Sequence, residues 1–312
     1  MLTEKYGKAV KGLGGLYNIR IEENGEAHYI SCKAKGVLHR GEEKLLIGDR
    51  VRVTIDDSTP DGVVVSEILP RKNSLIRPPM ANLDCIFAVV AAAKPAPVTE
   101  TIDKLIAIAE YNGILPVMVI TKADLDKERA EELYNVYSKA GFDVFITSTK
   151  TGEGIEEIKG YIEGKIKDGV TAAFAGASGV GKSTLINMLF PSLSLATAEI
   201  SRKIERGRHT TRHVELFALS EGAGAGFLAD TPGFSLLDFS RFDFFPLEAL
   251  VSTFRDISGY VGKCRYADCS HVGEGKDECA VIGAVLRGEI AESRHNSYKE
   301  IYKVLKAKKS YE

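Results

Sequence analysis

Two short motifs of nucleotide-binding proteins occur in this chain in the reverse of their usual order. The segment Thr121-Lys-Ala-Asp124 has the pattern of a loop that reads a guanine base, and Gly176-Ala-Ser-Gly-Val-Gly-Lys-Ser183 has the pattern of a phosphate-binding loop. In most GTPases the phosphate loop opens the domain and the base reader comes late. The reversed order therefore predicts a circularly permuted GTPase domain, whose new ends are free to carry other modules.

The phosphate loop stands in the local context that its chemistry requires. An apolar run at 172–175 precedes it, and residues 184–189 follow with the spacing of an amphipathic helix. Its glycines allow backbone conformations closed to other residues, so that N–H groups can cradle a β-phosphate at a helix N-terminus. We expect Lys182 to bridge the β- and γ-phosphates and Ser183 to bind Mg²⁺. The predicted nucleotide contacts of this loop are Gly176, Ala177, Ser178, Gly179, Val180, Gly181, Lys182, Ser183 and Thr184.

Two later segments fit the sensors of magnesium and of the γ-phosphate. Asp230-Thr-Pro-Gly233 follows the apolar run 226–229, which predicts a buried strand. Asp230 would hold Mg²⁺ through water, and the amide of Gly233 would sense the γ-phosphate. The basic segment 206–212 lies where a first switch with a magnesium-binding threonine belongs. Either Thr210 or Thr211 could be this magnesium ligand, and we take Thr211 as the working assignment. The alternative interpretation of the whole segment is a solvated basic loop.

Guanine selection rests on Asp124. A carboxylate there accepts hydrogen bonds from N1–H and the exocyclic amine of guanine, whereas adenine presents an acceptor at N1. The β-branched run 115–120 predicts a parallel strand, whose carboxyl end is where open α/β sheets bind ligands. Lys122 would cover the base with its aliphatic stem, and Thr121 stands where Asn is usual. Ser148 follows another apolar run and belongs to a candidate last base-contacting loop. Ordinary strand-to-helix turns are the alternative for both segments.

Length and composition limit the remaining possibilities. The chain has 312 residues, of which 44% are apolar, enough for two or three domains with ordinary cores. A formal net charge of −2 excludes a globally basic nucleic-acid-binding protein, so any RNA contact must come from local patches, and no DNA partner is expected. No apolar stretch reaches the length of a membrane span, and the N-terminus lacks a signal-peptide core. Five cysteines without an export signal indicate a cytoplasmic protein.

The first 70 residues have the pattern of a small antiparallel barrel. Alternating runs at 16–21, 27–32, 50–55 and 62–69 are separated by turn residues. Half-buried strands at this spacing favour an OB-fold, the commonest five-stranded arrangement. Its basic residues could form one face for an RNA backbone, although the interleaved acidic residues also fit a solvated surface. They are Lys8, Lys11, Arg20, Lys33, Lys35, Arg40, Arg50 and Arg52.

A cluster of metal-binding side chains follows the second switch. Cys264, Cys269, His271 and Cys279 supply three thiolates and an imidazole within 16 residues, enough for a closed, structural Zn²⁺ site. The alternative is a set of buried or redox-active thiols. The remaining cysteines, Cys32 and Cys85, lie in strand patterns and are expected to be core thiols. Residues 293–309 have the pattern of a basic amphipathic helix.

Taken together, these features resemble the circularly permuted ribosome small-subunit-dependent GTPase A family across essentially the whole chain. The resemblance is carried by the TKAD, STK, GASGVGKST, GRHTTRHVEL and DTPGF segments and by the Cys-Cys-His-Cys cluster. It implies an N-terminal OB-fold domain at 1–70, an α/β permuted P-loop GTPase domain at 71–236 and a mainly α zinc domain at 237–312. It also implies that GTP is the substrate and that the protein binds the small ribosomal subunit and its rRNA during late maturation of that subunit. The subunit would stimulate GTP hydrolysis, and hydrolysis would drive release of the protein. We expect a monomer, since such a factor needs no second copy.

The chain departs from the family pattern at three places. Thr121 replaces the usual Asn, Thr149 replaces the usual Ala of the last base loop, and the gap between His271 and Cys279 is longer than typical by about two residues. The first two bear on the tightness of guanine binding, and the third alters the zinc loop without removing a ligand.

The catalytic group is not evident from the motifs. Phe234 follows the DxxG motif where common small GTPases have a water-orienting Gln, so intrinsic hydrolysis should be slow. His209 in the first switch is the nearest group that could position water, although a surface His that touches rRNA fits as well. Two other functions are possible for such a chain. The first is an RNA-binding assembly factor with a vestigial nucleotide pocket, but the intact Lys182, Ser183 and Asp230 count against it. The second is a metabolic kinase or ATPase, and Asp124 counts against that function.

Overall fold

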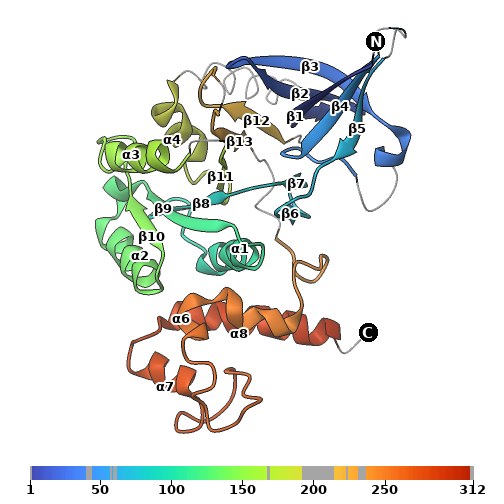
Figure 1. Cartoon of the computed structure of the whole chain (residues 1–312). Coiled ribbons are helices and arrows are strands. Elements are labelled where there is room, and N and C mark those ends of the chain that lie inside the picture. Colours follow the sequence, from blue (N-terminus) through green and yellow to red (C-terminus); the bar gives the residue numbers. More distant parts are fainter. Residues whose placement is uncertain are drawn as a thin grey trace. The chain divides into compact units, whose positions relative to one another are not determined.

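The computed structural model describes residues 2–39, 44–56, 58, 62–166, 169–191, 214–222, 224–230 and 237–309 (Figure 1). The chain divides into two units. The first unit comprises Met1–Cys85, Lys159–Phe174 and Phe190–Phe234, and the second comprises Ile86–Ile158, Ala175–Leu189 and Ser235–Glu312. Each unit is therefore assembled from segments that lie far apart in the sequence.

Five strands of the first unit form a closed barrel. In spatial order they are β1 (Leu2–Leu13), β2 (Leu16–Glu23), β3 (Glu26–Ala34), β5 (Val63–Ile68) and β4 (Arg50–Asp56), and β4 pairs again with β1 (Figure 1). The long strand β1 pairs with β4 through residues 2–8 and with β2 through residues 7–13. This order closes a five-stranded barrel, and the predicted OB-fold is confirmed. The sequence pattern indicated four of the strands but missed β1, because glycines and lysines interrupt its apolar alternation.

The interior of the barrel is apolar and closed to water. Ile19, Ile21, Val51, Val53 and Val65 are each at most 1% exposed. The first four alternate along β2 and β4, as the two-residue period of a strand requires, and Val65 lies on β5. A short 3₁₀ helix, η1 (Gly36–His39), follows β3.

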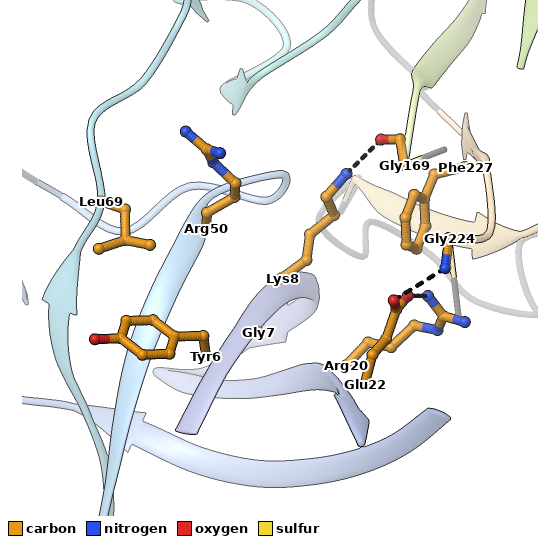
Figure 2. Close-up of a pocket in the computed structure, with 10 residues that line it drawn as sticks. All are labelled: Tyr6, Gly7, Lys8, Arg20, Glu22, Arg50, Leu69, Gly169, Gly224 and Phe227. Atoms are coloured by element: carbon orange, nitrogen blue, oxygen red, sulfur yellow. Dashed lines mark hydrogen bonds and ion pairs between the residues drawn. The ribbon is translucent and has the colours of Figure 1, made fainter. Parts of the chain in front are cut away.

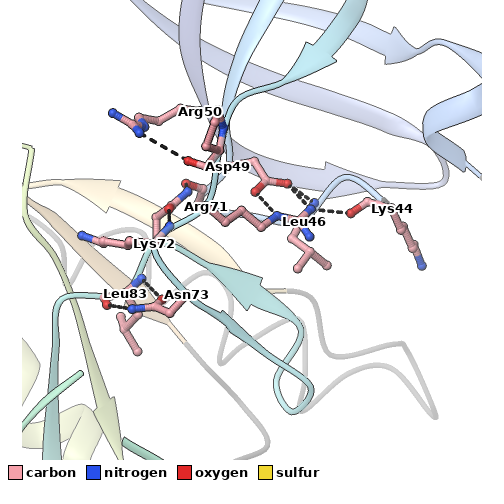
Figure 3. A network of polar contacts seen from close by, with 11 residues as sticks. Lys44, Leu46, Asp49, Arg50, Arg71, Lys72, Asn73 and Leu83 are labelled. Carbon is pink, nitrogen blue, oxygen red and sulfur yellow. Dashed lines mark hydrogen bonds and ion pairs between the residues drawn. The ribbon is translucent and has the colours of Figure 1, made fainter. Parts of the chain in front are cut away.

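A buried polar network joins the barrel to the segment that follows it. Figure 3 shows the fully buried Asp49, whose carboxylate accepts hydrogen bonds from Nε and Nη2 of Arg71 at 2.6 and 2.7 Å. The amide of Leu46 donates to the same carboxylate at 2.7 Å. Asn73 exchanges two hydrogen bonds with the backbone of Leu83, on either side of the small hairpin β6 (Ser74–Leu75) and β7 (Met80–Ala81). These contacts fix residues 71–83 in the first unit.

Three further strands extend the barrel sheet within the first unit. β11 (Thr171–Ala175) pairs in parallel with β13 (Phe227–Asp230), and β13 pairs antiparallel with β12 (Glu215–Ala218). β12 in turn pairs with β1, where Lys11 lies opposite Glu215 and their side chains form an ion pair at 2.8 Å. The strands that lead into the phosphate loop and into the DxxG motif are thus continuous with the barrel sheet.

The second unit contains an α/β core. Its strands are β8 (Cys85–Ala91), β9 (Leu115–Thr121) and β10 (Asp143–Ile146), in the order β10-β9-β8, with β9 and β10 parallel. The helices α1 (Thr99–Tyr111) and α2 (Lys127–Lys139) connect these strands, and η2 (Ala123–Leu125) precedes α2. The remaining helices are α3 (Ile155–Lys165), along which the division between the units falls, and α4 (Lys182–Leu189). Cys32 in the barrel and Cys85 at the start of β8 are each 3% exposed, as expected of core thiols.

The C-terminal part of the second unit is mainly helical, as predicted. It contains η3 (Leu247–Thr253), α6 (Arg255–Ser258), α7 (Ala280–Leu286) and α8 (Glu292–Lys309), the basic helix expected from the sequence. Arg294 on α8 is fully buried and bonds Asp103 of α1 at 2.6 Å and Asp256 of α6 at 2.9 Å. This cation therefore joins the C-terminal helices to the α/β core.

Candidate nucleotide and metal sites

The phosphate loop lies between Ala175 and α4, which begins at Lys182. Gly176, Gly179 and Gly181 all have positive φ angles, of 153°, 79° and 99°. A Cβ atom on Gly176 would lie 2.2 Å from the carbonyl oxygen of Val89. Strand β8 therefore passes too close to this position for any side chain, and the glycine is required both for its backbone angle and for space.

The ammonium group of Lys182 is held inside the phosphate loop. Its Nζ donates to the carbonyl oxygens of Gly176 and Ala177, both at 2.7 Å. Gly176 and Val180 are buried and anchor the loop, whereas the remaining predicted contacts lie nearer the surface. Of these, Ala177 and Gly181 are half-buried, and Ser178, Gly179, Ser183 and Thr184 are exposed. The loop thus combines a buried anchor, an inward cation and an accessible rim, as phosphate binding requires.

The base-reading motif touches the phosphate loop directly. Thr121 Oγ1 donates a hydrogen bond to the carbonyl oxygen of Val180 at 2.5 Å, across 59 residues of sequence. It also lies 3.2 Å from the carbonyl oxygen of Val90 on the neighbouring strand. Lys122 Nζ donates to the carbonyl oxygen of Gly179 at 2.7 Å. The base-reading motif and the phosphate loop are therefore in contact within one unit. The hydroxyl of Thr121, which stands where Asn is usual, makes one of these contacts.

A segment that the sequence analysis did not single out also meets this site. Lys122 adopts a left-handed backbone conformation with a φ of 56°, and its Nζ also donates to the carbonyl oxygen of Lys94. A Cβ atom on Gly179 would lie 3.9 Å from Cδ of Pro95. The position of this segment in the sequence could have indicated its role. Residues 92–97 follow the buried strand β8 and therefore leave the carboxyl edge of the sheet, where open α/β sheets bind ligands.

The carboxylate of Asp124 is oriented by the loop after β10. Ser148, which is fully buried, donates from Oγ to Asp124 Oδ1 at 2.6 Å. Lys150 of the same loop also approaches the base reader, with its Nζ 3.9 Å from Asp124 Oδ2. The bond from Ser148 fixes the rotation of the carboxylate, which a two-point contact with the edge of guanine needs. Ser148 thus stands beside the base reader, where a last base-contacting loop is expected.

Several predicted site residues fall outside the part of the chain that can be described. Asp230 is the last residue of β13, and its backbone position opposite Glu215 is known, but its side chain is not among those described. His209, Thr210, Thr211, Gly233 and Phe234 all lie outside the described residues. Their assignments stay predictions.

Cys264, Cys269, His271 and Cys279 converge on one point in the C-terminal part. Their ligand atoms all lie within 4.8 Å of one another. His271 Nδ1 lies 3.5, 3.4 and 3.5 Å from the sulfurs of Cys264, Cys269 and Cys279, and the first and last sulfurs are 4.0 Å apart. Usual zinc–ligand bond lengths give tetrahedral edges of about 3.6 Å between S and N and about 3.8 Å between two sulfurs. The cluster therefore fits a Zn²⁺ ion with four protein ligands and no open position.

The surroundings of the cluster support metal binding. The amides of Ala280 and Ile282 point at the sulfurs of Cys264 and Cys279, at 3.3 and 3.5 Å. Burial, reinforced by the neighbouring sulfur of Cys264, raises the pKa of Cys269 to about 12, so that a thiolate there needs a bound cation to stabilise it.

Glu274 holds the loop that carries His271. Its carboxylate accepts hydrogen bonds from the amide and hydroxyl of Ser270 and from the amides of Val272 and Gly273, at 2.7–3.2 Å. Burial alone would raise the pKa of Glu274, but these bonds, led by that from Ser270, lower it to about 2. The charged carboxylate thereby supports the positive φ of 61° that His271 adopts.

Comparison with known sequences gives matches along nearly the whole chain. The family described as RsgA GTPase matches residues 68–240, and the RsgA N-terminal domain matches residues 6–64. A protein of Agathobacter rectalis named small ribosomal subunit biogenesis GTPase RsgA is 39% identical over 98% of this chain and 99% of its own length. A protein of the same name from Caldanaerobacter subterraneus is 41% identical over 97% of this chain and 96% of its own length.

Solved structures match the fold as well. The crystal structure of YjeQ from Thermotoga maritima superposes with a TM-score of 0.77 at 34% identity, covering 97% of this chain and 99% of the other. The crystal structure of YloQ, described as a circularly permuted GTPase, gives a TM-score of 0.74 at 32% identity over 98% and 96% of the two chains. None of the helices that the structure describes combines the length and the apolar character of a membrane span.

Proposed function

Because the chain belongs to the RsgA GTPase family, we propose that it hydrolyses GTP while bound to the small ribosomal subunit, and that it acts in the late maturation of that subunit. The contact of Thr121 and Lys122 with the phosphate loop carries this proposal, because it puts a guanine reader and a phosphate cradle within reach of one nucleotide. The names of the relatives at 39% and 41% identity support the subunit as partner. Family membership also counts against the alternative of a metabolic kinase or ATPase.

In the proposed complex each motif has one task. Asp124, oriented by Ser148, reads the guanine edge, and Lys122 covers the base with its stem. Lys182 leaves the loop carbonyls for the β- and γ-phosphates. Ser183, Thr211 and Asp230 would hold a Mg²⁺ ion, which neutralises charge on the phosphates, and the Gly233 amide would sense the γ-phosphate.

Hydrolysis is proposed to depend on the subunit. Phe234 has no group that can bond a water molecule, so turnover by the isolated protein should be slow. Subunit binding orders segment 206–212 and delivers His209 to the attacking water. A His209→Ala variant should therefore keep nucleotide affinity and lose subunit-stimulated turnover. Full stimulated turnover in this variant would refute the assignment.

The three parts of the chain are proposed to act together on the subunit. Residues 1–70 contact rRNA, residues 71–236 bind and hydrolyse GTP, and residues 237–312 form a second contact around a structural Zn²⁺ held by the Cys₃His cluster. Hydrolysis weakens the grip on the subunit and releases a cytoplasmic, monomeric factor. Equal subunit affinity with GDP and with a non-hydrolysable GTP analogue would remove the basis of this release step.

The deciding experiment is GTP turnover at saturating Mg²⁺ with purified small subunits, with large subunits and with neither. We expect stimulation by small subunits alone. Binding to small subunits without any stimulated turnover would instead support an RNA-binding factor with a vestigial pocket.

A second experiment tests the base reader. Asp124→Asn should shift preference from GTP to XTP, since the amide can donate to the second oxygen of xanthine. Asp126→Asn is the matched control, because Asp126 only caps α2 by accepting from the amide of Arg129, a role that Asn also fills. Unchanged GTP use in the Asp124 variant would contradict the reading of guanine.

A further inference from the structure

A pocket lies in the first unit, where the barrel meets β13. Its volume is about 430 Å³, within the range of small-molecule sites. Figure 2 shows side chains from β1, β2 and β4 around the pocket, with Phe227 of β13 beside Lys8. All the residues that line it belong to the first unit, and none belongs to the phosphate loop or the base reader.

The pocket is rich in positive charge. Its lining contains Lys8, Arg20 and Arg50 against the single carboxylate of Glu22. Glu22 is already engaged, because it pairs with Arg20 and accepts from the amide of Gly224 at 3.0 Å. Arg50 has no carboxylate partner among the described residues, and its Nη2 reaches only the carbonyl oxygen of Pro70, at 3.3 Å. The lining therefore carries an excess of about two positive charges at neutral pH.

Two of these cations keep hydrogen-bond donors unused. Lys8 Nζ donates to the carbonyl oxygen of Gly169 and to Thr171 Oγ1, both at 3.0 Å, which leaves its third N–H without a partner in the described structure. The side chain of Arg20 is 1% exposed, yet its Nε has no partner among the described residues. A buried N–H without an acceptor is costly, so an anion bound in the pocket would offset a cost that the described residues leave.

The walls of the pocket are apolar and aromatic. Tyr6, Leu69 and Phe227 line it together with the cations (Figure 2). Lys8 Nζ lies 4.2 Å from the centroid of the Phe227 ring, and Arg20 Cζ lies 5.3 Å from it. The site therefore offers a charged floor for an anionic group and an apolar wall for the body that carries it.

We propose that this pocket binds a small organic phosphate monoester, with the phosphate at Lys8, Arg20 and Arg50 and the apolar part against Tyr6 and Phe227. A phosphate monoester carries between 1.5 and 2 negative charges at pH 7, which matches the excess of the lining, whereas a carboxylate carries one. Arg20 is buried and Lys8 is half-buried, so the charge of this site lies inside the pocket, where a small ligand fits better than a polymer backbone lying on the surface. Burial lowers the pKa of Lys8 to about 8, which leaves its ammonium mainly charged at pH 7, and a bound anion would stabilise that charge. This site is independent of the proposed function.

The probe for this site is phenyl phosphate, titrated calorimetrically into the full-length protein saturated with GDP and Mg²⁺ so that the phosphate loop is blocked. We expect saturable binding of one molecule per chain, tighter than that of inorganic phosphate, with shifts of the ring resonances of Tyr6 and Phe227. Arg50→Gln should weaken binding at least about tenfold, the effect of one charge-assisted hydrogen bond. Arg50 is exposed, so its replacement leaves the barrel core intact.

Arg52→Gln is the matched control, because Arg52 lies on the same strand but pairs with Glu4 and Glu67 outside the pocket. It removes the same charge and should leave phenyl phosphate binding within about twofold of the parent protein. Equal weakening by the two variants, equal affinity for inorganic and phenyl phosphate, or no saturable binding would each overturn the proposal. Displacement of the probe by additional GDP would overturn it too. Binding of a short single-stranded oligonucleotide in this pocket, without binding of phenyl phosphate, would have the same consequence.

Discussion

Replacing Thr121 by valine should weaken the binding of both GDP and GTP about tenfold, because it removes the tie between the base reader and the phosphate loop. Valine has nearly the same shape as threonine, so the buried position, 3% exposed, stays filled. The hydroxyl has a single proton, and the distance of 2.5 Å to Val180 against 3.2 Å to Val90 assigns that proton to the phosphate loop. One hydrogen bond is therefore lost.

The magnitude follows from that bond. A neutral hydrogen bond contributes about 0.5–1.5 kcal/mol net, and leaving the buried Val180 carbonyl without its donor adds to the cost. Without the tie the nucleotide itself must align the two motifs. A cost of about 1.4 kcal/mol in the binding step corresponds to the tenfold loss in Kd. The preference for GTP over XTP should not change, because Asp124 and its bond to Ser148 are untouched.

The assay is equilibrium binding of a fluorescent GDP analogue at saturating Mg²⁺. Thr147→Val is the matched control: Thr147 is fully buried, and its hydroxyl donates to the carbonyl oxygen of Ile120 at 3.1 Å, within the sheet. This control should bind within about twofold of the parent protein, and Thr121→Ser should retain most of the affinity because it keeps the hydroxyl. The reasoning fails if Thr121→Val binds as tightly as the parent, or if the Thr147 variant loses as much.

Three further outcomes are expected. Cys264→Ser should abolish the single bound zinc measured by elemental analysis, whereas Cys32→Ser, in the barrel core, should leave it; zinc retained in the first variant would exclude a four-ligand site. Arg294→Met leaves two buried aspartates without their cation and should lower the free energy of unfolding by about 3–5 kcal/mol in urea titrations; a loss below about 1 kcal/mol would contradict a structural role for this group. Burial lowers the pKa of Lys8 from 10.5 to about 8, so between these pH values the unfolded chain binds more protons than the folded one and this group makes stability rise with pH. The free energy of unfolding of Lys8→Met should therefore rise less between pH 8 and 10 than that of the parent protein. Parallel pH profiles of this free energy for the two proteins would disprove the lowered pKa.

Much of the fold and of the candidate site was predictable because it depends on local chemistry. The glycines of the phosphate loop, the apolar strands before each motif and the spacing of the cysteines are readable one segment at a time. Family membership, the barrel, the permuted α/β domain and the helical C-terminal part agree with those predictions. The barrel's long first strand was missed, since lysines and glycines there fill positions that a local pattern assigns to a loop.

Contacts between distant segments could not be predicted in this way. The sequence marked Thr121 as a departure from the usual Asn, and only the fold assigns its hydroxyl to Val180, 59 residues away. Likewise, the sequence placed Arg20 and Lys8 among the basic residues that could form a face for RNA or a solvated surface. The fold buries Arg20 and turns Lys8 toward Gly169, so these two cations line a pocket.

The sequence by itself determined which chemistry the chain carries, because residue type and short spacing decide what a loop can bind. Tertiary structure decided which of those groups meet, which are buried and which keep donors unused. The physical reason is that pairing between strands and packing between helices bring together residues whose separation along the chain leaves no local trace.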